Sequence, residues 1–266
     1  MTEWDALCAI FSQSRLETYL KAANQDREEA LNLYKLNLKL SEALYPSLCL
    51  FEITLRNRIS SVLVKHYGDN WFDGYQGNWL DGKNISFGSK EYNSELEAIN
   101  ILKSEFQKKN KEINSDNLTA NLSFSFWTGM LSRCYEKTLW QQHIIEVFPD
   151  VHPSNYNLKR NILQIRNKLF RIRKLRNRVF HYEPLFGTDN QSFADLLTDY
   201  ASAKKLMGWL NHDALKLLES EDRFKEIVTS IPPNHLLVLI PQNTRGLLKG
   251  VIFLREQKGL IFFALN

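Results

Sequence analysis

The sequence predicts a mainly α-helical protein, and three observations support this fold class. Apolar residues recur at intervals of three and four through most of the chain, which is the spacing of one helix face. Of the 266 residues, 44% are hydrophobic and 24% are charged, so the chain can bury a core of ordinary size. Short β-branched and aromatic runs, which favour strands, gather only near the C-terminus.

Three helices are predicted in the first quarter of the chain. Amphipathic spacing indicates a first helix from Trp4 to about Ala23. Asp26 suits the N-cap of a second helix, with Glu29 placed as in a capping box, and this helix should reach Pro46. A third helix follows from Leu48 to Gly68, a residue type that often ends helices.

Helical spacing returns after a loop that is rich in Gly, Asn and Asp. We expect one helix over residues 92–106 and an aromatic, apolar helical region over 124–147. The polar stretch over 108–121 between them should be a linker or the frayed end of the first of these helices. A long basic helix should open at Pro153. A last helix should begin at Ser192, with Asp195 completing a box-like cap, and extend towards Glu219.

The end of the chain differs from the rest and defines a separate segment. We predict a helical domain over residues 1–222 and a C-terminal extension over 223–266. Two short apolar runs in the extension, Val251–Leu254 and Leu260–Phe263, are separated by a polar stretch that ends in Gly. This pattern predicts a small β-hairpin packed on the helical bundle.

Composition excludes several classes of protein. No stretch reaches the roughly 18 uncharged apolar residues of a membrane span, and the N-terminus is acidic where a signal peptide is basic. We therefore expect a cytoplasmic protein. The three cysteines, Cys8, Cys49 and Cys134, form no CxxC pair, and the six histidines form no HxxxH pair. No metal site and no cofactor are predicted.

The basic helix is the strongest sign of a polyanionic partner. Between Lys159 and Arg178 there are nine Lys or Arg residues and no Asp or Glu. Such a block suits a nucleic acid, although a solvated helix face would give the same composition. Four aromatic residues of the predicted loop over residues 70–89 could similarly stack on bases or pack against the core (Trp71, Phe72, Tyr75 and Trp79).

One basic residue of this helix lies in an apolar stripe. Ile165, Leu169, Ile172, Arg176 and Val179 follow alternating spacings of four and three, so they should form one continuous buried stripe in which the guanidinium of Arg176 needs a partner. His181 follows five residues later, where Pro184 must end the helix. Asn177 shares a face with His181, and its amide could orient the imidazole.

The stretch Arg176-Asn177-Arg178-Val179-Phe180-His181 resembles the RNxxxH signature of the HEPN superfamily, which includes many metal-independent endoribonucleases. Two further blocks resemble its Abi-like (abortive infection) branch, namely Leu50 to Asn57 (LFEITLRN) and Tyr67 to Phe72 (YGDNWF). The stretch ALNLY with Asn37, and the FSFW stretch from Phe124, fit the same pattern. The resemblance covers roughly residues 15 to 215.

The resemblance implies a HEPN-like helical bundle with extra helices and a metal-independent endoribonuclease. In this reaction the 2′-hydroxyl of RNA attacks the adjacent phosphorus, with His181 as general base or acid and Arg176 on the phosphate. The resemblance further implies a 2′,3′-cyclic phosphate product and a homodimer in which two motifs face each other. Abortive infection, phage defence and toxin activity are the implied roles.

The candidate site residues follow from this interpretation. The catalytic set is Arg176, His181, Asn177 and Glu52. Glu52 can pair with Arg56, four residues on along the same helix face, and by resemblance it could reach Arg176. An intramolecular ion pair that holds two helices together is the alternative to a catalytic role for Glu52. The RNA-binding set is Arg56, Arg166, Arg173, Lys174 and Arg178. The alternative function is a non-catalytic RNA-binding module, with an antitoxin protein as a further partner.

Overall fold

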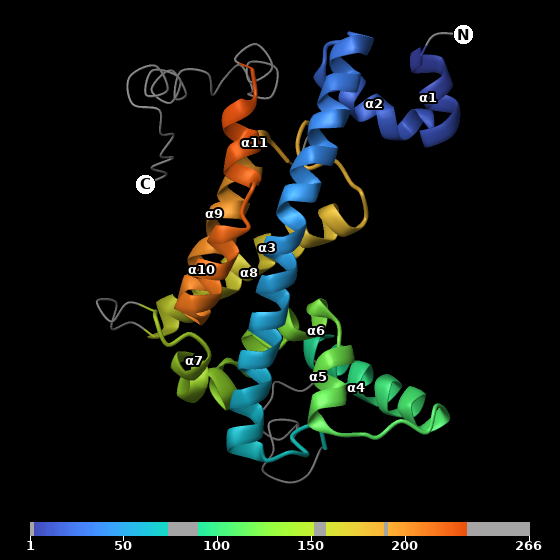
Figure 1. Ribbon diagram of the computed structural model, residues 1–266. Coiled ribbons are helices and arrows are strands. Elements are labelled where there is room, and N and C mark those ends of the chain that lie inside the picture. Colours follow the sequence, from blue (N-terminus) through green and yellow to red (C-terminus); the bar gives the residue numbers. More distant parts are fainter. Residues whose placement is uncertain (1–2, 74–89, 152–157, 189–190, 233–266) are drawn as a thin grey trace. The chain divides into compact units, whose positions relative to one another are not determined.

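The computed structural model describes residues 3–73, 90–151, 158–188 and 191–232, and its regular structure there is helical (Figure 1). Within these ranges the only β-type pairing is an isolated bridge between Thr188 and Gln191. The mainly α fold class is therefore confirmed. The chain divides into two compact units: unit 1 comprises residues 1–47, 175–199 and 221–266, and unit 2 comprises residues 48–174 and 200–220.

Two short helices begin unit 1. Helix α1 spans Glu3–Phe11 and helix α2 spans Gln13–Ala22, and the two helices contact each other. The prediction of one helix from Trp4 to Ala23 is wrong, because Ser12 has a φ of 73° and interrupts the helical backbone. Residues other than glycine rarely adopt such a φ.

Helix α3 spans Arg27–Tyr67 without a break and contributes residues to both units. Oδ1 of Asp26 accepts hydrogen bonds from the N–H groups of Glu28 and Glu29, which confirms the predicted N-cap. The predicted separation into two helices at Pro46 is wrong. Proline costs roughly 3 kcal/mol in a helix interior, and we attribute its acceptance here to the burial of flanking residues such as Leu44 and Leu48.

The rest of unit 1 includes the start of helix α9, Phe193–Leu210, and helix α11, Phe224–Ser230. The predicted box at the start of α9 is confirmed: Oγ of Ser192 accepts from the N–H of Asp195, and Oδ2 of Asp195 accepts from the N–H of Ser192. Helix α11 was not predicted from the sequence. The predicted hairpin within residues 251–263 lies outside the described residues.

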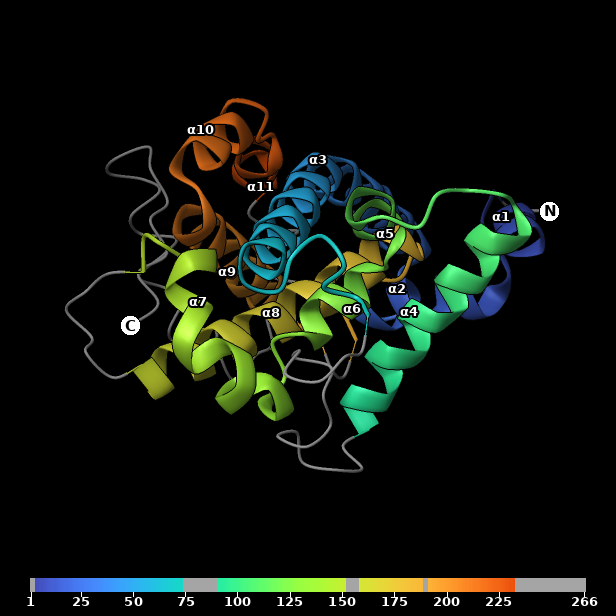
Figure 2. The same cartoon turned by 90° about the horizontal axis from the view of Figure 1, so that it is seen from below.

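In unit 2, the second half of α3 is followed along the chain by helices α4, α5 and α6. Helix α4 spans Lys90–Lys108 and contacts α5, Ser115–Asn121, and α6, Phe124–Gly129 (Figure 2). The predicted linker over 108–121 thus contains a helix, which begins where the side chain of Asn114 caps it.

Two aromatic residues that follow the end of α3, Trp71 and Phe72, lie in the core of unit 2. Trp71 is fully buried, and its indole N–H donates to Oγ of Ser115 at 2.8 Å. Phe72 is also buried and lies against Trp71. For these two residues the packing interpretation is therefore confirmed. Tyr75 and Trp79 lie outside the described residues.

The second half of unit 2 is also helical. It contains a 3₁₀ turn η1 (Arg133–Tyr135), a π-helical turn η2 (Glu136–Trp140), α7 (Gln141–Val147), most of α8 (Leu158–Phe180), the end of α9 and α10 (His212–Ser220). The predicted last helix is therefore divided at Asn211, whose side chain caps α10 through the N–H of Ala214.

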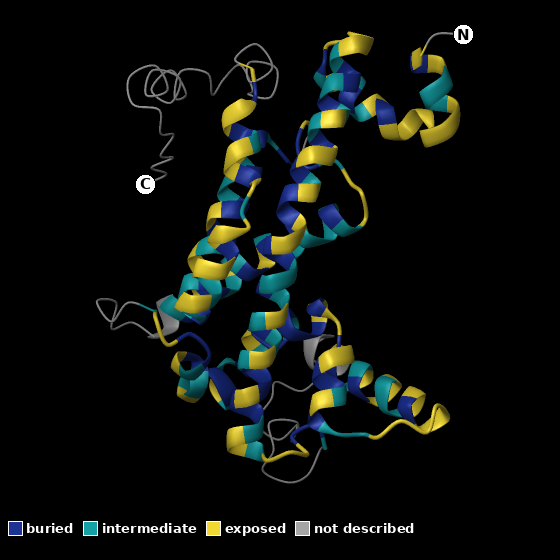
Figure 3. Ribbon diagram, in the orientation of Figure 1, coloured by how far each residue is buried: buried dark blue, intermediate teal, exposed yellow. Residues whose placement is uncertain are grey.

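Most helices bury one face and expose the other, as the alternating colours in Figure 3 show. The buried side of each unit is aliphatic and aromatic, with Tyr19 and Phe186 in unit 1 and Trp127 and Trp140 in unit 2 among the largest enclosed side chains. Among the described residues, no helix combines the length and the apolar character needed to cross a membrane.

Candidate active site at the end of helix α8

The apolar stripe predicted along α8 is present. Ile165, Leu169, Ile172 and Val179 are buried, whereas Arg176 in the same stripe is half-buried. The last turn of α8, from Leu175, belongs to unit 1. The apolar stripe is therefore confirmed, but Arg176 is less buried than predicted.

The guanidinium of Arg176 lies on an aromatic ring at the end of the helix. Its central carbon is 4.2 Å from the centroid of the Phe180 ring, and Nη1 is 3.5 Å from Oδ1 of Asn177. The Phe180 ring also stacks on Tyr45, with centroids 4.9 Å apart and an angle of 20° between the rings. Because Phe180 immediately precedes His181, the Arg176 side chain reaches along the helix to the last turn.

His181 directly follows Phe180, the last residue of α8, and it is exposed. The N–H of Glu183 donates to the carbonyl of Arg178 at 2.8 Å, and the N–H of Tyr182 donates to that of Val179 at 3.4 Å. These two bonds form a Schellman motif, in which Tyr182 takes the left-handed position with a φ of 59°. The helix ends where Pro184 predicted it would.

Two arginines hold the segment that follows His181. Nη1 of Arg15 donates to the carbonyl of Tyr182 at 2.7 Å, and Nη1 of Arg178 donates to the carbonyl of Pro184 at 2.6 Å. These contacts fix the carbonyls on both sides of Glu183. The backbone around the exposed imidazole is therefore determined by charged side chains from α2 and α8.

The predicted residues fall into the two units as follows. Unit 1 contains Arg176, Asn177, Arg178 and His181, and unit 2 contains Glu52, Arg56, Arg166, Arg173 and Lys174. Several of these arginines make contacts within their own unit. Arg56 donates to the carbonyl of Ala120, and Arg166 donates to the carbonyl of Leu131 and to Glu136. Lys174 is exposed, and Arg173 lies 5.7 Å from the centre of the Phe170 ring.

Basic residues crowd together on the unit 2 part of α8. Burial lowers the pKa of Lys168 below its ordinary value of 10.5, and the positive charges of Lys205 and Arg171 lower it further. Like charges held this close repel one another, and a bound anion would relieve that repulsion.

Sequence reasoning missed four residues that make contacts at the end of α8 or in the turn after it: Arg15, Tyr45, Phe180 and Tyr182. Phe180 follows Arg176 by four positions, which is a spacing that brings two helical side chains together, so this contact could have been found. Arg15 and Tyr45 lie far from the motif in sequence, and no local pattern indicates them. Tyr182 is 73% exposed, which leaves its ring accessible to a ligand.

The sequence matches the profile of the Abi-like protein family over residues 5–187. This match covers more than half of the chain, includes the RNxxxH stretch, and shows that the chain belongs to the Abi-like family. Membership associates it with abortive infection, a form of phage defence. The search of curated proteins and the search of solved structures gave no match.

Proposed function

We propose that this protein is a metal-independent endoribonuclease of the HEPN type that acts in the cytoplasm in abortive infection or as a toxin. The observation that carries the proposal is the end of α8, where a half-buried guanidinium reaches the last helical turn and an exposed imidazole follows it. Both groups belong to unit 1, and the RNxxxH stretch that supplies them lies within the family match.

The proposed reaction needs only groups that RNA and this chain supply. His181 takes the proton from the 2′-hydroxyl, or gives one to the departing 5′-oxygen, a role worth roughly 10² to 10⁴ in rate. The 2′-oxygen bonds to phosphorus, the bond from phosphorus to the 5′-oxygen breaks, and a 2′,3′-cyclic phosphate results. Arg176 neutralises the negative charge that grows on the phosphate oxygens.

The other predicted residues take supporting roles in the proposal. Asn177 is within reach of Arg176 and is a positioning residue for the guanidinium. Glu52 is retained as a fourth member of the catalytic set on the family resemblance. We propose a homodimer, so that two copies of the motif supply the base and the acid of one composite site.

RNA contact is assigned first to Lys174 and Arg173, with Arg56, Arg166 and Arg178 contributing charge. The last three already donate to carbonyl groups of the protein, so they can attract phosphate mainly through their charge. The stacked rings of Tyr45 and Phe180 offer an unpaired base a surface beside the site.

The same aromatic surface favours the alternative, a non-catalytic RNA-binding or regulatory module, which could pair with an antitoxin protein. The two functions differ in one result. A binding module retains RNA with a strong dependence on salt but leaves it intact, with log affinity falling by roughly 0.7 per neutralised phosphate as log salt rises.

The test is incubation of the purified protein with RNA in EDTA, followed by analysis of the new ends. We expect cleavage that leaves 2′,3′-cyclic phosphates, and loss of cleavage with near-normal RNA affinity in His181→Ala. The matched control is His212→Ala, which removes an exposed imidazole at the start of α10 and should cut at the wild-type rate. Equal rates for His181→Ala and wild type would contradict the catalytic assignment.

A further inference from the structure

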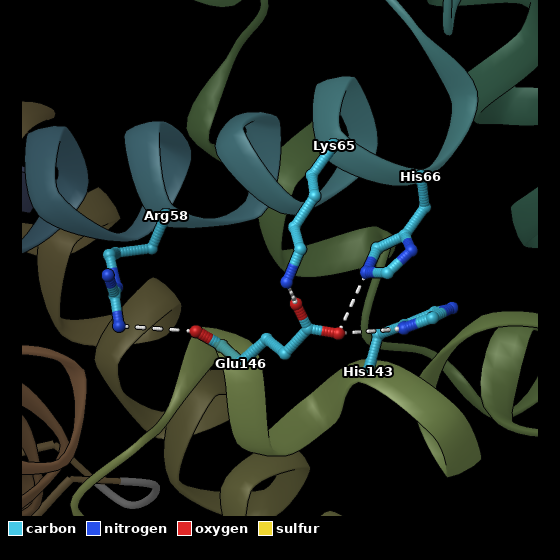
Figure 4. A network of polar contacts seen from close by, with 5 residues as sticks. All are labelled: Arg58, Lys65, His66, His143 and Glu146. Carbon is cyan, nitrogen blue, oxygen red and sulfur yellow. Dashed lines mark hydrogen bonds and ion pairs between the residues drawn. The ribbon is translucent and has the colours of Figure 1, made fainter.

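A second cluster of chemically reactive side chains lies in unit 2, between the end of α3 and helix α7 (Figure 4). Nε2 of His66 is 2.8 Å from Oε1 of Glu146, and Nδ1 of His143 is 3.0 Å from the same oxygen. The two imidazole rings face each other with centroids 3.8 Å apart. One carboxylate oxygen is thus shared by two imidazole nitrogens from different helices.

The other atoms of Glu146 are also held in place. Its Oε2 accepts a hydrogen bond from Nζ of Lys65 at 2.7 Å, and its backbone carbonyl accepts one from Nη2 of Arg58 at 3.2 Å (Figure 4). The hydrogen bond from Lys65 is the largest cause that lowers the pKa of the carboxyl to about 2. A glutamate side chain is ordinarily ionised at neutral pH, and the carboxylate is the form that binds cations.

We propose that His66, His143 and Glu146 form a binding site for one divalent transition-metal ion of the Zn²⁺ type. Two imidazole nitrogens and one carboxylate oxygen are a common set of three protein ligands for zinc, and a water molecule completes such a site. Imidazole ligands favour Zn²⁺ and its neighbours over Mg²⁺ and Ca²⁺, which prefer oxygen ligands.

The geometry requires only short movements. The three ligand atoms all lie within 4.8 Å of one another. Tetrahedral zinc with bonds of about 2.0 to 2.2 Å places its ligand atoms about 3.3 Å apart. Each nitrogen must therefore move away from Oε1 by a few tenths of an ångström, and the two nitrogens must also come to about this distance from each other. Rotation of the partly exposed side chain of His66 would allow its Nε2 and the Nδ1 of His143 to bind one ion.

Burial and the surrounding contacts also suit an ion. The side chains of His66, His143 and Glu146 are 27%, 13% and 30% exposed, so the cluster is partly shielded but open to entry. Lys65 resembles the outer partners that orient ligating carboxylates in metal sites. The ion would join the last turn of α3 to α7.

Few features of the sequence indicate this site. His143 and Glu146 form an HxxE pair on α7, but His66 is 80 positions away from Glu146. Short-range patterns such as HxxxH cannot detect a ligand set that is divided between two helices. For this reason the prediction of no metal site, which rests on such patterns, is replaced here by a proposal of one.

The first test is calorimetric titration of the EDTA-treated and dialysed full chain with ZnCl₂. We expect one site per chain, and a loss of affinity of at least about tenfold in each of His66→Ala, His143→Ala and Glu146→Gln. His212→Ala, in the same unit but outside the cluster, should bind as the wild type does. Absence of binding, or equal binding by all variants, would overturn the proposal in favour of a plain ion-pair network.

Two further measurements identify the metal ligands and the effect of the bound ion on thermal stability. Co²⁺ bound by two nitrogens and an oxygen in four-coordinate geometry should give intense visible absorption in the wild type, and His143→Ala should lack this absorption. Excess Mg²⁺ should not displace the bound Co²⁺. Zn²⁺ should raise the Tm of the wild type and of His212→Ala but not of His66→Ala. A Tm rise of equal size in all three proteins would contradict the site.

This proposal is independent of the ribonuclease proposal. The metal cluster lies in unit 2, whereas Arg176 and His181 lie in unit 1. The titration and the Co²⁺ spectrum need no RNA, so their failure would leave the cleavage assay unaffected. Conversely, loss of cleavage in His181→Ala would leave the expected Zn²⁺ affinity unchanged.

Discussion

Oδ1 of Asn37 accepts a hydrogen bond of 2.8 Å from the backbone N–H of Leu185, a residue 148 positions away in the sequence. Both residues are buried in unit 1. This bond fastens the segment that follows His181 to helix α3. It gives a physical role to Asn37, which the sequence places among the residues that resemble the Abi-like pattern.

Asn37→Ala should destabilise the protein by about 1 to 3 kcal/mol, because it leaves a buried N–H of Leu185 without its acceptor. Urea unfolding at neutral pH measures the effect. Asn32→Ala is the matched control on the same helix, since Asn32 is only half-buried, and it should change stability by less than about 0.5 kcal/mol. Equal losses in the two variants would contradict the role given to this bond.

Tyr182→Gly should stabilise the fold by up to about 1 kcal/mol, because glycine adopts the φ of 59° without strain. Differential scanning calorimetry should show a Tm increase of up to about 4 °C. Tyr182→Ala keeps the strain and removes the same ring, so it serves as the comparison. If both variants have the wild-type Tm, the left-handed position stores no strain at this residue.

Arg176→Lys should reduce the rate of RNA cleavage roughly 10²-fold, because an ammonium group cannot present the planar pair of donors that a phosphate accepts. RNA affinity should fall much less. Lys174→Ala should do the opposite, leaving the single-turnover rate intact while lowering the salt dependence of binding by about 0.7. Single-turnover kinetics and filter binding separate the two effects, and a wild-type rate for Arg176→Lys would remove Arg176 from the catalytic set.

Lys168→Met should raise stability at neutral pH, because burial and the charges of Lys205 and Arg171 make the protonated form costly in the folded state. The folded pKa lies below the unfolded value of 10.5, so the folded protein releases this proton first and wild-type stability rises with pH between the two values.

The advantage of Lys168→Met should therefore shrink as pH approaches 10.5. Urea unfolding at about pH 7.5 and about pH 9.5 tests this expectation. The control is Lys174→Met, which alters an exposed lysine and should show no such trend. An advantage that is constant with pH would indicate packing of the new methionine instead of charge.

The sequence was most informative where periodicity and capping act locally. The N-caps at Asp26 and Ser192, and the end of α8 before Pro184, are as predicted, because each depends on residues within one turn. The continuous helix through Pro46 and the break at Ser12 were not predicted. Both depend on packing and backbone strain that a propensity argument does not include.

In the candidate site, too, the features that depend on local sequence were predicted and the contacts between distant residues were not. The RNxxxH stretch pointed to Arg176 and His181, and helical spacing placed Arg176 in the buried stripe. Arg15, which bonds a carbonyl 167 positions away, could not be found in this way. The cluster of His66, His143 and Glu146 was missed for the same reason, because its members meet only after α3 and α7 have packed together.

The Schellman turn at the end of α8 has a consequence for genetic studies. His181 directly follows the last residue of α8. The position of its imidazole therefore depends on the backbone of this turn and on the distant side chains that bond to the turn and to the segment after it. An amino-acid change at Arg15 should therefore inactivate the protein in cells while leaving it folded and abundant, whereas a change at Asn37 should also lower its stability. A screen for inactive mutants would recover them beside the true active-site changes, although neither residue needs to touch RNA.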